Sequence, residues 1–108
     1  MSILIYGATG YTGALIARIA QQMGMPVTLA GRNEEKLRAV ASETALEYVA
    51  VDLADTARLL EIVSQYSVVL HIAGPFSQTA PPMVEACLTA GTHYLDITGE
   101  IAGFARHR

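Results

Sequence analysis

Five short apolar runs alternate along the chain with segments of helical spacing, and this alternation restricts the fold more than any other feature. The runs are nearly continuous, which is typical of parallel strands buried on both faces. They lie at Ile3–Tyr6, Val27–Ala30, Tyr48–Val51, Val68–Ile72 and Tyr94–Ile97. Parallel strands need crossover connections, and crossovers through helices are right-handed. The pattern therefore predicts an α/β fold, a Rossmann-like doubly wound parallel sheet of five strands in the order 3-2-1-4-5.

The segments between the runs carry apolar side chains at helical spacing. The expected stripes are Leu15, Ile16, Ile19, Ala20 and Met23; Leu37, Val40 and Ala41; Leu59, Leu60 and Val63; and Val84, Cys87 and Leu88. Asp55 is placed to cap the third helix. Pro81 and Pro82 should lie near the start of the fourth helix, with Gly91 just past its end.

A glycine triplet, GATGYTG, lies where the first strand should pass into the first helix. Gly7 would let the chain turn off the strand, Gly10 would let a pyrophosphate approach the backbone, and Gly13 would let the helix pack closely. Backbone N–H groups and the positive helix end would then face the phosphates. Further donors in the same loop come from Thr9, Tyr11 and Thr12.

By itself a glycine triplet could be only a tight turn, but here it lies in the first strand-to-helix turn of a five-strand pattern. That context predicts dinucleotide binding. NAD sites usually carry an acid at the end of the second strand, where this chain has Gly31 and Arg32. A guanidinium suits a phosphate, so NADP is favoured over NAD. Asn33 is expected to cap the next helix or to touch the phosphate, and the acids after it, Glu34 and Glu35, fit a first helical turn.

The motifs GATGYTG, LAGRN, AGPF and ACLTAGTHYLDITGE together resemble the saccharopine dehydrogenase-like oxidoreductases, which include the trans-acting enoyl reductases. The resemblance runs from the first strand to Glu100. It implies an N-terminal NAD(P)-binding domain followed by a substrate domain, so residues 1–108 are expected to be the first part of a longer protein. It does not name a substrate.

The resemblance also implies a role for each motif. Gly7, Gly10, Thr12 and Gly13 would contact the pyrophosphate. Arg32 and Asn33 would contact the adenosine phosphate. Asp52 would lie near the adenine, although it could equally be a loop or cap residue. The nicotinamide half would be bordered by Gly74, Pro75 and Phe76. The far side of the cleft would be closed by Asp96, Gly99 and Glu100.

The remaining chemically active residues have simpler explanations. His71 lies inside an apolar run and is expected to be a satisfied core residue, and Cys87 lies on a helix stripe and is expected to pack. His93 has no partner at ligand spacing, so no metal site is predicted. The only lysine is Lys36, and the Tyr-x-x-x-Lys pair of short-chain dehydrogenases is absent. The sequence therefore does not identify catalytic residues.

Charge and composition argue against some classes of binding partner. A net charge of −3 argues against a nucleic-acid surface, and no apolar run is long enough to span a membrane. One cysteine cannot form an internal disulfide, which fits the cytoplasm. Two functions stay open: the cofactor domain of an NADP-dependent oxidoreductase acting on a small molecule, or a non-catalytic NADP(H) sensor. A homodimer is also allowed.

Overall fold

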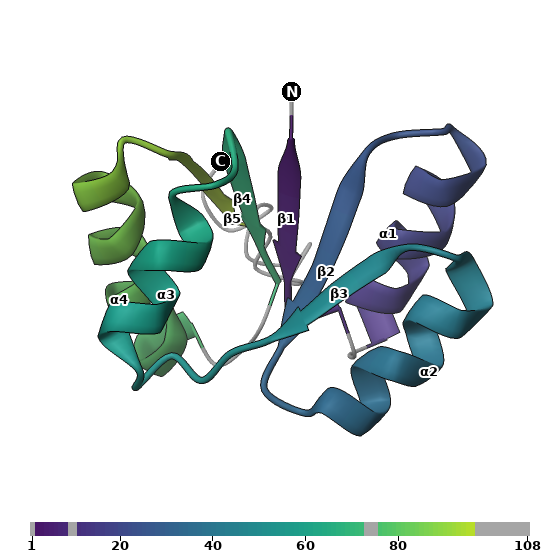
Figure 1. The fold of residues 1–108 in the computed structure, drawn as a ribbon, viewed down its shortest axis with the longest axis horizontal. Coiled ribbons are helices and arrows are strands. Elements are labelled where there is room, and N and C mark those ends of the chain that lie inside the picture. The colour runs from purple at the N-terminus through teal and green to yellow at the C-terminus, as the bar shows by residue number, and fades with distance from the viewer. Residues whose placement is uncertain (1, 9–10, 73–75, 97–108) are drawn as a thin grey trace, which may run out of the picture.

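A computed structural model describes residues 2–8, 11–72 and 76–96. The strands form one parallel five-stranded sheet in the order β3-β2-β1-β4-β5, which confirms the predicted topology. Helices α1 and α2 lie on one face of the sheet, and α3 and α4 lie on the other (Figure 1). The elements in chain order are β1 (Ile3–Tyr6), α1 (Tyr11–Gln22), β2 (Val27–Gly31), α2 (Glu34–Thr44), β3 (Glu47–Ala50), α3 (Thr56–Val63), β4 (Val68–His71), α4 (Phe76–Ala90) and β5 (His93–Asp96).

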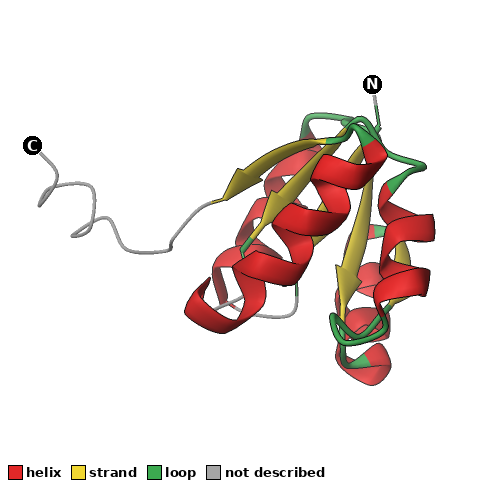
Figure 2. Ribbon diagram, turned by 90° about the vertical axis from the view of Figure 1, so that its left-hand side faces the viewer, coloured by secondary structure: helices red, strands yellow, loops and turns green. Residues whose placement is uncertain are grey.

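The strands differ from the predicted runs only at their ends. β3 and β5 begin at Glu47 and His93, polar residues that lie outside the apolar runs. Both residues are exposed, yet each is paired in the ladder, Glu47 with Thr28 and His93 with Val68. Backbone pairing does not depend on the polarity of the side chain, so the hydrophobic pattern locates a strand better than it locates the strand's first residue. Seen from the side, the strand arrows share one general direction (Figure 2).

The helix ends follow their capping residues. Asn33 accepts a hydrogen bond from the backbone N–H of Lys36 at 3.0 Å, and Asp55 accepts one from Arg58 at 3.3 Å. Both side chains are therefore N-caps, the role that Asp55 was predicted to have and one of the two open to Asn33. Glu34 lies in the first turn of α2, where negative charge is favoured.

The start of α4 differs from the prediction. The helix begins at Phe76, so Pro81 and Pro82 lie inside it rather than at its first turn. The fixed φ of proline is compatible with a helix, and the cost of an interior proline is a missing backbone donor and crowding against the carbonyl four residues earlier. Helix α4 ends before Gly91, as predicted.

The apolar stripe predicted for α1 was wrong in part. Leu15, Ile19 and Met23 are 43%, 46% and 68% exposed, whereas Ala17 and Ala20 are buried. The buried face of α1 therefore runs through small residues at positions 13, 17 and 20. Small side chains let the helix axis come close to the sheet, and the larger apolar side chains then point outward. Leu88 on α4 is likewise 77% exposed, although its neighbour Cys87 is buried as predicted.

Each face of the sheet has its own core. Leu4, Tyr6 and Val69 pack with α3 and α4. Ile5 and Leu29 pack with α1 and α2. Successive strand residues thus enter opposite cores, as buried parallel strands require.

Gly13 brings α1 against the turn that follows β1. A Cβ added at Gly13 would collide with the carbonyl oxygen of Gly7 and would lie 2.7 Å from the Cα of Ala8. All of these atoms belong to the backbone, so no side-chain rotation relieves the overlap. The close approach predicted for Gly13 is therefore present, and α1 makes it against the turn that follows β1.

We expect Gly13→Ala to lower the free energy of unfolding by about 2–4 kcal/mol, because α1 must move away from the turn. Gly31→Ala is the matched control. A Cβ at Gly31 would lie 3.7 Å from Leu37, an ordinary contact, so we expect a change within about 1 kcal/mol. Urea denaturation measures both. Equal losses in the two variants would contradict the steric explanation.

Candidate cofactor-binding site

The carboxyl ends of the strands are joined by backbone hydrogen bonds that continue the sheet past its last paired residues. Gly7 N–H donates to the Ala30 carbonyl at 2.9 Å, and Val51 N–H donates to the Gly31 carbonyl at 2.9 Å. Ile72 N–H donates to the Tyr6 carbonyl at 2.8 Å. The loops after β1, β3 and β4 therefore leave one shared edge, and in a doubly wound sheet this edge is where ligands bind.

The described part of the first loop begins with a glycine turn and ends at the start of a helix. Gly7 has φ of +97°, a conformation that side chains disfavour, and the chain enters α1 at Tyr11 a few residues later. The first turn of α1 contains no acidic residue, so nothing there cancels the positive end of the helix. Thr12 is half-buried in that turn. Thr9 and Gly10 lie outside the described residues, as does the side chain of Tyr11.

The loop after β2 presents a cation. Arg32 directly follows the last residue of β2 and its side chain is exposed. The ion pairs between described residues join Arg18 to Glu43 and Arg38 to Glu34, and Arg32 takes part in neither. A guanidinium at this edge, beside the glycine that ends the strand, fits the phosphate that distinguishes NADP from NAD.

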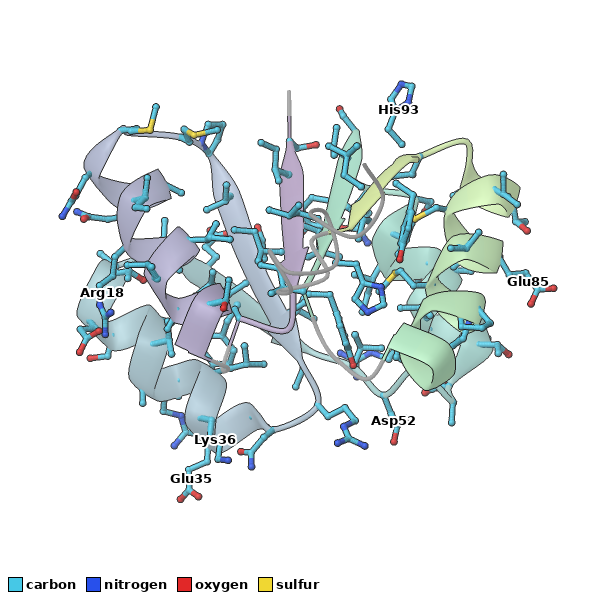
Figure 3. All side chains as sticks on the ribbon, turned by 180° about the vertical axis from the view of Figure 1, so that it is seen from behind. Arg18, Glu35, Lys36, Asp52, Glu85 and His93 are labelled. Carbon is cyan, nitrogen blue, oxygen red and sulfur yellow. The ribbon has the colours of Figure 1, made fainter. Side chains whose placement is uncertain are left out.

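Asp52 lies in the loop after β3 and organises it. Its carboxylate accepts a hydrogen bond from the N–H of Ala54 at 2.9 Å, and its carbonyl accepts one from the N–H of Asp55 at 3.0 Å. Figure 3 shows Asp52 at the end of the molecule that carries Lys36, with His93 at the opposite end. Asp52 is therefore a loop-forming residue at the candidate edge, a position compatible with both of its predicted roles.

Other predicted site residues cannot be placed. Gly74 and Pro75 lie outside the described residues, as do Gly99, Glu100 and the side chain of Asp96. Phe76 begins α4, and its side chain also lies outside the described part. The nicotinamide half of the predicted site therefore stays a prediction.

Three aromatic residues behind the edge were not assigned to the site from the sequence. Tyr6 and His71 end β1 and β4, and their rings meet edge to face with centroids 5.8 Å apart. His71 meets Tyr94 in the same way, and its Nδ1 lies 2.9 Å from the Tyr94 hydroxyl. His71 is fully buried and its Nδ1 has a polar partner, so its predicted place in the core is confirmed. The sequence signal that could have pointed to Tyr6 and His71 is that β1 and β4 each end on a large polar aromatic residue.

Burial controls the protonation of the Tyr6 hydroxyl. Burial raises the pKa of Tyr6 to about 12, with Arg32 opposing the shift and Asp52 adding to it. The Tyr6 hydroxyl therefore stays protonated at neutral pH and can donate a hydrogen bond there.

Within residues 2–8, 11–72 and 76–96, no three His, Cys, Asp or Glu residues gather closely enough to hold a metal ion. None of the helices in that same part is long and apolar enough to cross a membrane.

Together, the fold and this edge define a dinucleotide-binding domain of the doubly wound parallel-sheet class. Residues 3–106 match the family described as saccharopine dehydrogenase NADP binding domain, and the chain belongs to that family. NADP is thus the cofactor of the family, as Arg32 predicted. The resemblance drawn from the sequence motifs is confirmed.

Individual relatives extend this comparison. The chain is 39% identical to a trans-acting enoyl reductase of Mycobacterium ulcerans, over 92% of this chain and 25% of the relative. It is 30% identical to a human saccharopine dehydrogenase-like oxidoreductase, over 91% of this chain and 27% of the relative. The chain thus spans about a quarter of the length of these relatives.

A solved structure shares the fold. Apo saccharopine dehydrogenase (L-Glu forming) from Saccharomyces cerevisiae superposes with a TM-score of 0.72 at 19% identity. The match covers 88% of this chain and 21% of the yeast chain.

Cys87 offers a test of the packing on the α4 side of the sheet. Burial raises the pKa of its thiol to about 11, and the thiolate is the reactive form. We expect a disulfide reagent at pH 8 to leave Cys87 unlabelled in the folded protein. Labelling should accelerate only as the pH approaches 11, and the same protein in guanidinium chloride should react fully at pH 8. Rapid labelling of the folded protein at pH 8 would show that α4 does not seal this core.

Proposed function

We propose that NADP(H) binds along the carboxyl edge of the sheet and that the chain is the cofactor domain of an NADP-dependent oxidoreductase. The observation that carries the proposal is the combination at this edge of a glycine turn, the start of α1, and an exposed Arg32 that forms no ion pair with a described residue. The first two features suit a pyrophosphate, and the third suits the additional phosphate of NADP.

In the proposed arrangement each loop has one task. The turn from Gly7 to Gly13 holds the pyrophosphate with backbone N–H groups, assisted by Thr9, Tyr11 and Thr12. Arg32 and Asn33 hold the adenosine phosphate, and Asp52 lies beside the adenine. The segment after β4, Gly74 to Phe76, borders the nicotinamide. The bound cofactor supplies hydride chemistry, and the residues of this chain bind and orient it.

Asn33 would have two roles in this arrangement, as the cap of α2 and as a phosphate contact. Its side-chain oxygen already caps α2, so a phosphate contact must come from its amide nitrogen or its backbone. Such a shared residue would couple the position of the phosphate to the start of α2. The cap therefore supports the proposal by holding the loop after Arg32 in one conformation.

For the whole protein we propose a longer chain in which residues 1–108 form the NADP-binding domain and a second domain completes the substrate site. The relatives support this, because the chain matches about a quarter of their length. The proposed substrate is a small molecule, and neither a nucleic acid nor a membrane is proposed as a partner. Because one relative is named an enoyl reductase, an activated carbon–carbon double bond is the first group to test.

The location proposed is the cytoplasm, where the buried thiol of Cys87 would stay reduced. A homodimer is compatible with this proposal. Size-exclusion chromatography with light scattering would measure the oligomeric state.

Arg32→Ala should weaken NADPH binding by about tenfold to a hundredfold, the value of a charge-assisted contact, and should leave NADH affinity nearly unchanged. Fluorescence titration with each cofactor measures both constants. Arg38→Ala is the matched control, because Arg38 is an exposed arginine paired with Glu34 on α2. Equal affinity of the unmodified protein for NADPH and NADH, unaltered by Arg32→Ala, would contradict the proposed phosphate site.

The longer protein should oxidise NADPH in the presence of a substrate, and residues 1–108 alone should do so at least about a hundredfold more slowly. Hydride transfer needs donor and acceptor held about 3–3.5 Å apart, which one edge of a sheet does not ensure. A panel of enoyl thioesters, imines and ketones provides the assay. Comparable turnover by residues 1–108 would show that the catalytic site is complete within them. Cofactor binding by the longer protein without turnover on any substrate would favour a sensor.

A further inference from the structure

Tyr6 connects strands that are not neighbours in the sheet. Its side chain is 2% exposed, and its hydroxyl donates a hydrogen bond to the carbonyl oxygen of Val51 at 3.1 Å. Strand β2 lies between β1, which Tyr6 ends, and β3, after which Val51 follows. The side chain therefore reaches beneath the end of β2, on the face covered by α3 and α4, and ties the end of β1 to the loop after β3.

Val51 is held on both sides, and this fixes the residue that follows it. Its N–H donates to the Gly31 carbonyl at 2.9 Å, and its carbonyl accepts from Tyr6. The first bond ties Val51 to the residue before Arg32. The second sets the peptide plane that leads into Asp52. Both candidate adenosine-binding loops thus meet at Val51.

The ring of Tyr6 is itself fixed. It meets the fully buried His71 ring edge to face, with the ring planes at 79°. A side chain locked at its ring can aim its hydroxyl at one position, which is what a positioning group requires. Burial also keeps water from replacing the bond to the Val51 carbonyl.

We propose that Tyr6 is a positioning residue of the NADP site, whose hydroxyl holds the Val51 carbonyl and so keeps the Asp52 loop in the arrangement that the adenosine half requires. This inference rests on the proposed function. It assigns to Tyr6 an action through Val51 and Asp52 and no contact with the cofactor.

Tyr6→Phe tests the inference, because it keeps the ring against His71 and removes only the hydroxyl. The affinities for NADPH and NADH should both fall, by about two- to tenfold and by the same factor, because the adenosine half is common to the two cofactors. Arg32→Ala, in contrast, should lower only the affinity for NADPH. Titrations are made well below the unfolding temperature of each variant.

A second measurement does not involve the cofactor. The N–H groups of Ala54 and Asp55 donate to the side chain and the carbonyl of Asp52, so their hydrogen exchange reports the order of this loop. In Tyr6→Phe we expect these two amides to exchange at least about fivefold faster, with little change at the amides of α2. Tyr66→Phe is the matched control, because Tyr66 packs against the same core but lies beside Ser2 and Pro26, at the other end of the sheet. It should alter neither affinity nor these amides.

The two measurements separate the possible failures. Unchanged exchange at Ala54 and Asp55 in a folded Tyr6→Phe protein would overturn the positioning role. Faster exchange with unchanged affinities would show that the Asp52 loop is not part of the cofactor site, which overturns the inference but leaves the Arg32 site intact. A selective loss of NADPH affinity would overturn it as well, since it would mean that Tyr6 acts through Arg32 alone. If Tyr6→Phe does not fold, Asp52→Ala tests the step on which the inference depends, namely that the Asp52 loop belongs to the cofactor site. Equal weakening of both cofactors supports that step, and unchanged affinities overturn the inference.

Discussion

The contact between Gly13 and the carbonyl of Gly7 is the constraint on which the rest of the candidate cofactor edge depends. Because Gly13 lacks a Cβ, the first turn of α1 can rest on the backbone that leaves β1. The start of the helix is thereby directed to the same edge at which the strands end. A phosphate at this edge can then meet both the turn and the helix N-terminus, the two sources of backbone N–H groups. The small residues Ala17 and Ala20 extend the close approach along the helix.

The edge is built mainly from backbone, and only a few side chains add specificity to it. Hydrogen bonds beyond the strand ends align the loops after β1, β3 and β4. Arg32 and Asp52 then supply charge, and the buried Tyr6 hydroxyl braces the loop that carries Asp52. Backbone donors suit a pyrophosphate, which every dinucleotide shares. Side-chain charge suits the phosphate by which NADP differs from NAD, so in the proposed arrangement each part of the cofactor is recognised by a separate set of groups.

Local signals in the sequence predicted local structure well. The caps of α2 and α3 follow from Asn33 and Asp55, because a cap is a contact between residues three apart. The interior of α4 was harder to predict. Pro81 and Pro82 are ordinary start signals, yet α4 begins at Phe76, because the fixed φ of proline also fits the interior of a helix.

The sequence by itself determined the sheet order, and it predicted the edge for the candidate cofactor loops and a cation that would favour NADP. These features depend on the order of apolar runs, on handed crossovers and on residues at a fixed distance from a strand end, all of which can be read along the chain. Only the tertiary structure decided which face of α1 is buried and that Tyr6 reaches Val51. The first depends on how closely two backbones approach, and the second joins residues 45 positions apart across an intervening strand. Contacts of that kind are set by the packing of the whole sheet, and the periodicity within one segment does not predict them.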